Sequence, residues 1–225
     1  MCGRFVMTDP NTALASLFGA SPANDLPEPP RYNICPTQSV AVIRSEAGLR
    51  HMVPMRWGFL PHWYKTPTDG PLLINARAES IAQKPAFRAA CRARRCLLPA
   101  TGFYEWTKDA EGKRLPWYIT RADTAPLAFA AIWQDWSAKV DGAMQTHRTV
   151  AIVTTAAAPD MAVLHHRCPV VLAPEDWPKW LGEAGHGAAP LMTAPPEGTL
   201  AWHRVDVEVN SNRAQGDHLI TPVAA

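Results

Sequence analysis

The sequence has almost no excess of charge and no long apolar run. Its 22 Lys and Arg residues stand against 20 Asp and Glu residues, a formal net charge of +2, so any anion-binding site must be a local cluster of charges. No apolar run approaches the roughly 18 residues of a membrane span, and the N-terminus lacks the charged-then-apolar pattern of a signal peptide. We therefore expect a cytoplasmic protein without a membrane segment.

Paired cysteine motifs are also missing. The chain has five cysteines, an odd number, and the Cys91-x4-Cys96 spacing has no second pair that would complete a zinc site. Thiols kept reduced in the cytosol fit this pattern best. We expect neither a metal centre nor a cofactor.

What the sequence does have is apolar residues, 47% of the chain, in many short segments bounded by turn signals. These predict strands over 40–45, 49–57, 96–99, 117–120, 127–133, 149–154, 170–172 and 202–209. Helical spacing predicts short helices over 9–19, 84–94, 159–165 and 174–181. The pattern indicates an α+β fold, in which residues 1–225 form a single domain on a curved, barrel-like mixed β-sheet with short peripheral helices. The Gly- and Pro-rich residues 183–199 are expected to form an exposed loop, followed later by a short C-terminal tail.

Cys2 follows the initiator Met1 directly. Because Cys is small, removal of Met1 is expected, and the mature chain would then begin with a residue that carries an α-amine and a thiol on adjacent carbons. The amine can condense with an aldehyde, and the thiol can close on the imine to form a thiazolidine. Ring closure would be intramolecular and therefore fast. The alternative is that Cys2 is a chance residue in a disordered N-terminus.

A row of polar residues follows an apolar segment at 74–79. Strand alternation places Asn75, Arg77 and Glu79 on one face, where an amide, a cation and a carboxylate are costly unless they are paired or solvated. The row fits a functional site, and it fits equally a solvated sheet face with an Arg77–Glu79 ion pair.

Two further segments hold titratable groups. Glu105 lies between Tyr104 and Trp106, where apolar surroundings would raise the pKa of its carboxyl and suit it to acid–base catalysis; a solvent-exposed edge-strand Glu is the alternative. His165 and His166 are adjacent, so they should point in different directions, and at most one should reach a given site. No third ligand follows at metal spacing.

Two segments combine cations with aromatic or helical patterns. Residues 56–65 are rich in aromatic and basic residues, a composition typical of stacking platforms for single-stranded nucleic acid, although Trp57 and Phe59 could equally belong to the core. A second basic cluster lies at 88–95, where Arg88 and Arg92 share a helix face. A solvated helix face explains it as well as phosphate contact does.

Taken together, these segments resemble the SRAP family (SOS-response-associated peptidase), whose members crosslink to abasic sites in single-stranded DNA. The matching pieces run in family order along nearly the whole chain: Cys2-Gly3-Arg4-Phe5, Arg31-Tyr32-Asn33 with Pro36-Thr37, Arg56-Trp57-Gly58 through Trp63, Asn75-Ala76-Arg77 with Glu79, Arg95-Cys96-Leu97-Leu98-Pro99, Gly102-Phe103-Tyr104-Glu105-Trp106, His165-x-Arg167-x-Pro169 and Val209-Asn210. Departures are Cys168 where Met is frequent, Tyr64 in place of a second Trp, and His166 where an acidic residue is frequent.

The resemblance implies roles for individual residues. Cys2 would be the crosslinking nucleophile, with Asn75 orienting its amine. Glu105 and His165 would transfer protons. The implied DNA contacts are phosphate binding by Arg4, Arg77 and Arg167, and aromatic contact by Trp63, Tyr64 and Trp106.

The function implied is detection of abasic sites in single-stranded DNA by a covalent thiazolidine crosslink through Cys2, which shields the lesion. This is a lyase-like activity, and Cys2 could also remove Met1 autoproteolytically. We expect a monomer in the cytoplasm, associated with the nucleoid when bound to DNA. One rival is an N-terminal-nucleophile peptidase or amidase in which Cys2 attacks an amide. Another is a plain single-stranded DNA-binding module, against which the small net charge argues.

Overall fold

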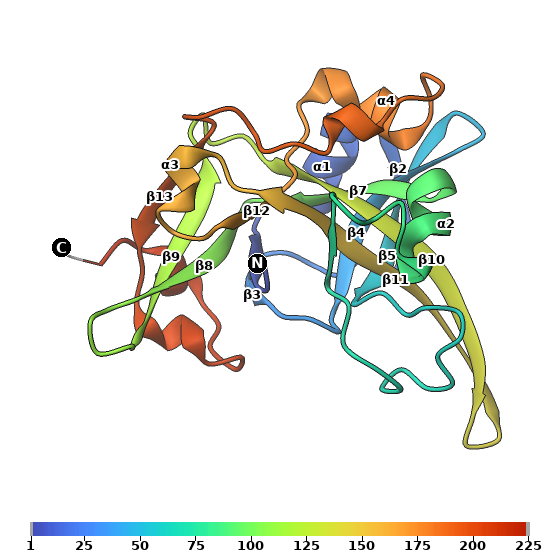
Figure 1. Ribbon diagram of the computed structural model, residues 1–225, viewed down its shortest axis with the longest axis horizontal. Helices are drawn as coiled ribbons and strands as arrows, with labels where there is room; N and C mark the ends of the chain where they lie inside the picture. The colour runs from blue at the N-terminus through green and yellow to red at the C-terminus, as the bar shows by residue number, and fades with distance from the viewer. Residues whose placement is uncertain (1, 224–225) are drawn as a thin grey trace.

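A computed structural model describes residues 2–223 of the chain (Figure 1). The strands are, in chain order, β1 (Phe5–Met7), β2 (Ala20–Pro22), β3 (Arg31–Ile34), β4 (Ser39–Glu46), β5 (Leu49–Trp57), β6 (Asn75–Arg77), β7 (Arg95–Ala100), β8 (Gly102–Lys108), β9 (Arg114–Arg121), β10 (Leu127–Val140), β11 (Ala143–Ala156), β12 (Arg167–Pro169) and β13 (Leu200–Arg204). The helices are α1 (Asn11–Phe18), α2 (Pro85–Ala93), α3 (Pro159–Ala162), α4 (Trp177–Leu181) and the 3-10 turns η1 (Pro174–Asp176), η2 (Ala189–Leu191), η3 (Val207–Asn210) and η4 (Asp217–Ile220). None of the helices in residues 2–223 combines the length and the apolar composition needed to cross a bilayer.

Five strands close into a mixed barrel in the order β11-β10-β7-β4-β5. Neighbours in this order pair antiparallel, and the barrel closes where β11 pairs parallel with β5, with Thr149 opposite Arg56 and Val150 opposite Trp57. The central strands are continuous apolar runs because they are buried along their length, as in 127–132. This confirms the prediction of an α+β domain on a barrel-like mixed sheet.

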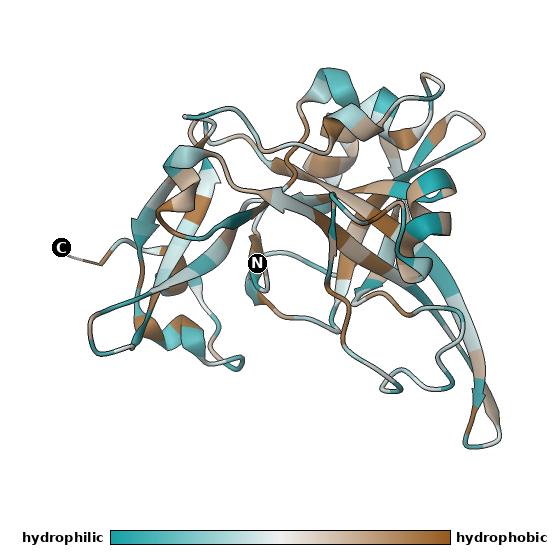
Figure 2. Ribbon diagram, viewed as in Figure 1, coloured by the Kyte–Doolittle hydropathy of each residue, from teal (hydrophilic) through white to brown (hydrophobic). Residues whose placement is uncertain are grey.

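The second sheet has the strand order β13-β9-β8-β1-β3. Its strand β1 pairs with β8 through Phe5 and Phe103, while the Phe5 ring turns to the barrel and meets Trp57 edge-on at 5.1 Å. The short strand β1 therefore joins the core of one sheet to the core of the other. In Figure 1 the N-terminus accordingly lies between the barrel and the β8–β9–β13 side of the molecule, and Figure 2 shows apolar residues along the strands of both parts.

Most predicted elements are present, several with different bounds. The helix expected over 84–94 is α2, and the strands expected over 40–45 and 49–57 are β4 and β5. The strand expected over 202–209 ends at Arg204, because the Asp206 carboxylate accepts a hydrogen bond from the Glu208 backbone N–H at 2.8 Å and starts η3. Of the strand expected over 170–172, Val171 makes an isolated antiparallel bridge to Phe129, just after the strand β12. The helix expected over 159–165 stops after one turn.

Candidate functional site

Cys2 is fully buried and lies three residues before the start of β1, the strand that joins the two sheets. The Asn75 side-chain Nδ2 donates a hydrogen bond to the Cys2 carbonyl oxygen at 2.9 Å. Asn75 is held in place because β6 pairs parallel with β11 of the barrel, with Asn75 opposite Ile152, while Ala76 turns inward and is buried. The structure thus brings Cys2 and Asn75 together across 73 positions of sequence.

Glu105 lies on β8 in the second sheet and is 2% exposed. Burial raises the pKa of its carboxyl above the ordinary value. The pKa of the Cys2 thiol is also raised well above its ordinary value, first by burial and second by the Glu105 charge. The 2% exposure of Glu105 rules out the solvent-exposed edge-strand alternative.

His165 is half-buried in the bend between α3 and β12. The Arg167 backbone N–H lies 2.9 Å from its Nδ1 and the Arg167 carbonyl oxygen lies 3.1 Å from the same atom, so the Arg167 backbone holds the ring in place. Burial lowers the pKa of His165, which favours the neutral form of the ring. The prediction that His165 and His166 point apart is wrong: their rings stack at 4.4 Å, because the bend is not a regular element with alternating side chains.

A hollow of about 300 Å³, called the first hollow here, gathers residues from distant segments. It is lined by Gly3, Arg4, Glu105, Trp106, Thr107, Lys108, Arg114 and His165. Four predicted site residues thus share one cavity next to buried Cys2. Lys108 and Arg114 were not predicted; they face each other across the β8–β9 hairpin, and only the unpredicted strand β8 brings them to the site.

Two cations of the first hollow, Arg4 and Arg114, contact neighbouring side chains or backbone. Arg4 donates from Nη1 to Asn33 Oδ1 at 2.8 Å and to the Val209 carbonyl at 3.0 Å, and from Nη2 to Asn212 Oδ1. The Trp106 ring lies between two guanidinium groups, with Arg4 Cζ 5.7 Å and Arg114 Cζ 4.8 Å from its centroid. The positions of these groups are therefore fixed before any ligand arrives.

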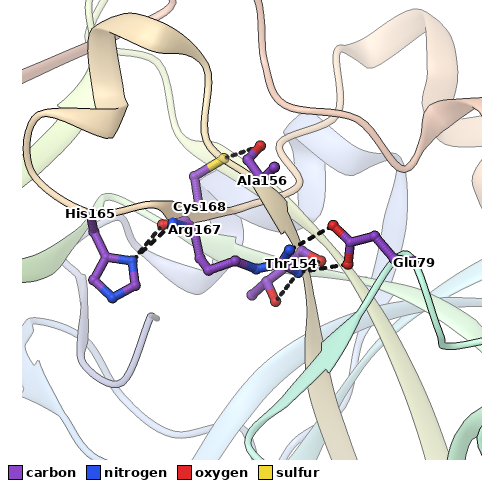
Figure 3. A network of polar contacts seen from close by, with 6 residues as sticks. All are labelled: Glu79, Thr154, Ala156, His165, Arg167 and Cys168. Carbon is purple, nitrogen blue, oxygen red and sulfur yellow. Dashed lines mark hydrogen bonds and ion pairs between the residues drawn. The ribbon is translucent and has the colours of Figure 1, made fainter.

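Arg167 is buried, and its guanidinium faces Glu79 (Figure 3). Nη1 and Nη2 pair with the two carboxylate oxygens at 2.6 and 3.0 Å, and Nη2 also donates to the Thr154 carbonyl at 2.7 Å. The Arg77–Glu79 pair considered from the sequence is therefore wrong, because Glu79 pairs with Arg167. This geometry makes Arg167 a support for the loop that carries His165.

A second hollow of about 420 Å³ lies beyond Asn75. Its lining residues are Trp63, Leu73, Asn75, Arg77, Ser80, Lys84, Pro85, Ala86 and Phe87. Trp63 is 47% exposed and Arg77 is exposed, so a ring and a cation face solvent here. Asn75 lines this hollow and bonds to Cys2, and the next residue, Gly3, lines the first hollow.

Tyr64 differs from its neighbour Trp63. It is 9% exposed, packs with Leu60 and Trp136, and donates from its hydroxyl to the Pro71 carbonyl at 3.3 Å. The ring also covers Gly70, where a Cβ atom would lie 2.4 Å from the Tyr64 hydroxyl oxygen. The structure thus gives Tyr64 a packing role, and of the two aromatic residues Trp63 is the one available for stacking.

Within residues 2–223, no group of three His, Cys, Asp or Glu side chains is arranged to hold a metal ion. The predicted loss of Met1 lies outside the described residues.

The amino-acid sequence is similar to those of known proteins. The sequence model of the family described as SOS response associated peptidase (SRAP) matches residues 1–212. The chain is 34% identical over 187 residues to abasic site processing protein YoaM of Bacillus subtilis, covering 80% of this chain and 79% of the relative. It is 32% identical over 231 residues to abasic site processing protein YedK of Escherichia coli, covering 99% of this chain and 100% of the relative.

Solved structures show the same fold. A crystal structure of a protein from Bacteroides thetaiotaomicron superimposes with a TM-score of 0.85 at 23% sequence identity, covering 99% of this chain and 100% of the other. A phage-related protein from Bordetella bronchiseptica gives a TM-score of 0.70 at 28% identity, covering 96% and 100%. The barrel with its second sheet is therefore an architecture that experimentally determined structures share.

Proposed function

The chain belongs to the SOS response associated peptidase (SRAP) family, and from this premise we propose that it captures abasic sites in single-stranded DNA as a covalent thiazolidine on Cys2. Its relatives YoaM and YedK are named abasic site processing proteins, which supports the lesion as the target. The covalent link would shield the lesion. All the proposed groups come from one chain, in keeping with a monomer that acts in the cytoplasm and joins the nucleoid when bound to DNA.

The placement of Cys2 carries this proposal. Its backbone is held by Asn75 at 2.9 Å, its thiol interacts electrostatically with Glu105, and the next residue, Gly3, lines the first hollow. A residue fixed in this way has its α-amine and thiol in a defined orientation once Met1 has been removed. Such orientation lowers the entropic cost of a two-step capture.

The reaction needs no redox partner. The opened deoxyribose of an abasic site presents an aldehyde at C1′. The Cys2 α-nitrogen adds to this carbon and forms a carbinolamine, which loses water to give an imine. The Cys2 sulfur then adds to the imine carbon while the thiol proton moves to the nitrogen, so that a thiazolidine forms and one water molecule is released overall.

Glu105 and His165 suit the proton transfers in these steps. A carboxyl with a raised pKa keeps a larger protonated fraction near neutral pH, so Glu105 is a suitable acid for the departing carbinolamine oxygen. Burial lowers the pKa of His165, which favours the neutral ring, and the Arg167 backbone holds its Nδ1 in place. The raised pKa of the Cys2 thiol keeps it protonated until the imine is ready to receive the sulfur.

The two hollows suit the DNA on either side of the lesion. We propose that Arg4 in the first hollow and Arg77 in the second contact flanking phosphates, and that Trp63 stacks on a neighbouring base. Stacking and phosphate contact tolerate any base sequence. Arg167 would act through the loop of His165 by virtue of its ion pair with Glu79.

The N-terminal-nucleophile hydrolase is less well supported by the same geometry. A thiol attacks an amide as thiolate, and the environment of Cys2 raises the pKa of the thiol, which disfavours the thiolate. Imine closure has no such requirement, because the thiol proton is transferred as the sulfur adds.

The decisive experiment is intact mass spectrometry after incubation with an abasic oligonucleotide. The wild-type protein should give one species with the mass of the chain without Met1, plus the DNA, minus one water. Cys2→Ala keeps an α-amine but has no sulfur, so it should give an imine that borohydride traps and no adduct that survives without reduction.

An oligonucleotide with a tetrahydrofuran in place of the abasic sugar has no aldehyde and serves as the control, which should give no adduct with any variant. A stable adduct of undiminished yield from Cys2→Ala would exclude the thiazolidine. Turnover of a peptide or amide by wild type in the absence of DNA would instead support the hydrolase.

A further inference from the structure

The segment around α2 is strongly basic although the chain as a whole is almost neutral. Between Ser80 and Tyr104 there is no Asp or Glu, whereas the whole chain has 20 of them. The same segment carries five cations, Lys84, Arg88, Arg92, Arg94 and Arg95. This is the kind of local cluster that an anion-binding surface requires in a chain without net charge.

Two of the five cations are structural. Arg94 donates from Nε to the Trp133 carbonyl at 3.2 Å and from Nη2 to Gln134 Oε1 at 3.3 Å. Arg95 donates to the Trp180 and Cys91 carbonyls. These bonds fasten the C-terminal end of α2 to β10 and α4, and they account for both side chains without any ligand.

The other three cations have no such explanation. Lys84, Arg88 and Arg92 follow one another at intervals of four, so they form one line along the helix, and all three are exposed. Within residues 2–223, none of the three side chains makes a hydrogen bond or an ion pair. At 1.5 Å of rise per residue the line extends over about 12 Å. We call these three residues the α2 stripe.

The α2 stripe begins at the candidate site. Lys84 lines the second hollow together with Trp63, Asn75 and Arg77. Arg92, at the other end, lines a separate hollow of about 450 Å³ between α2 and α4. A continuous exposed cationic path therefore leads from Asn75, which contacts Cys2, along the whole of α2.

We propose that a single-stranded DNA chain leaving the second hollow continues along α2, with its phosphates against the α2 stripe. This inference rests on the proposed function and extends the DNA-binding surface beyond the two hollows. A regular line of cations without carboxylate partners matches a polyanion, and contact with it releases counterions whatever the base sequence. Continuity with the hollow that holds Trp63 and Arg77 favours DNA over any other anionic partner.

The test measures non-covalent affinity as a function of salt concentration. The probes are tetrahydrofuran-containing single strands, which cannot crosslink: a short one of about five nucleotides, and longer ones of about twelve extended on the 5′ or the 3′ side. The variant is Arg88→Gln with Arg92→Gln, since Gln is a good helix former and should leave α2 intact. The charge-matched control is Lys113→Gln with Lys139→Gln, two exposed residues far from α2 in sequence.

In wild type, one of the long strands should show a steeper dependence of log affinity on log salt than the short strand. The Arg88→Gln, Arg92→Gln variant should lose about 1.4 of that slope, 0.7 for each lost phosphate contact, on the long strand only. The control should keep the full difference between long and short strands. Equal slopes for short and long strands in wild type, or equal losses on both strands in the variant, would overturn the proposal.

Adduct formation separates this inference from the proposed function. The α2 variant should crosslink a short abasic strand at the wild-type rate, because Cys2, Asn75 and Glu105 are untouched. Absence of any adduct in wild type would defeat the thiazolidine mechanism. A normal adduct together with an unchanged salt slope would defeat only the α2 track.

Discussion

The two hollows beside Cys2 differ in how their polar side chains are held. In the first hollow the Glu105 carboxyl is buried and the Arg4 guanidinium is bonded to Asn33, Val209 and Asn212. In the second hollow Trp63 is 47% exposed, and Arg77 and Lys84 face solvent. The first hollow is therefore organised before a ligand arrives, and the second retains freedom to adapt.

This difference matches the demands of the two proposed tasks, proton transfer in the first hollow and DNA contact in the second. Proton transfer needs a group held within about half an ångström of its partner, and buried, bonded side chains supply such rigidity. Phosphate contact and base stacking tolerate variation in position and sequence, so exposed cations and rings are adequate. Asn75 lines the second hollow and bonds to the Cys2 carbonyl oxygen, and the residue after Cys2, Gly3, lines the first hollow.

The largest effect is expected from Glu105→Gln, which keeps the shape of the side chain but removes its titration. The rate of adduct formation at saturating DNA should fall by about a hundredfold, the usual contribution of a general acid or base. In wild type the rate should decline as pH rises through the raised pKa of Glu105, because the protonated form is the acid. The variant should lack this decline.

Affinity for a tetrahydrofuran strand provides the control for Glu105→Gln. It should remain within about twofold of wild type, about 0.4 kcal/mol, since Glu105 is buried and Gln keeps the shape of its side chain. A large loss of affinity with an unchanged rate of adduct formation at saturating DNA would contradict the proposal that the first hollow carries out proton transfer.

A smaller effect, on DNA affinity and not on the rate of adduct formation, is expected in the second hollow. Trp63→Ala should weaken binding of the tetrahydrofuran strand by about tenfold, because stacking of a base on an aromatic ring contributes roughly 1–3 kcal/mol. The rate of adduct formation at saturation should stay unchanged. Fluorescence anisotropy and single-turnover kinetics on the same variant separate the two quantities.

Tyr64→Phe is the matched control at the neighbouring position. The Tyr64 ring is buried, and its hydroxyl bonds to the Pro71 carbonyl, so the change should lower the free energy of unfolding by about 1 kcal/mol and leave affinity alone. Weakened DNA binding by Tyr64→Phe at full stability would mean that the ring, despite its burial, belongs to the DNA surface.

The fold was largely predictable from local patterns. Apolar β-branched segments such as 127–132 become barrel strands because burial on both faces requires continuous apolar runs. The helix at α2 was predicted because apolar residues four apart, Phe87 and Cys91, are a strong local signal. Strands β1, β2 and β3 were missed, since each has four residues or fewer and exists only through pairing with distant segments. The longer strand β8 was not predicted either.

The site was less predictable than the fold, because its contacts join distant segments. Ordered family motifs named Cys2, Asn75, Glu105 and His165, but nothing local indicates that Glu79 pairs with Arg167, 88 positions away. The stacking of His165 on His166 likewise depends on an irregular bend. Lys108 and Arg114 line the first hollow because β8 pairs with β9. No sequence motif indicates this pairing.

The smallest expected effect concerns the ion pair behind the first hollow. The Arg167 guanidinium hydrogen-bonds to Glu79 and lowers the pKa of its carboxyl below the ordinary value. Glu79 is 52% exposed on its side chain, so solvent screening limits the contribution of the pair to about 0.5 kcal/mol. Glu79→Gln should lower the free energy of unfolding by that amount at neutral pH.

The pH dependence of this difference identifies its cause. A carboxyl whose pKa is lower in the folded state than in the unfolded state, about 4.3, stabilises the fold fully above that value and loses its contribution as pH falls through the lowered folded value. The free energies of unfolding of wild type and Glu79→Gln, measured in urea, should therefore differ at pH 7 and become equal in acid. The control Glu28→Gln, at an exposed position, should have the wild-type free energy of unfolding at both pH values. A difference that persists unchanged into acid would show that Glu79 acts by packing, and Arg167 would then need another partner to hold the loop of His165 in place.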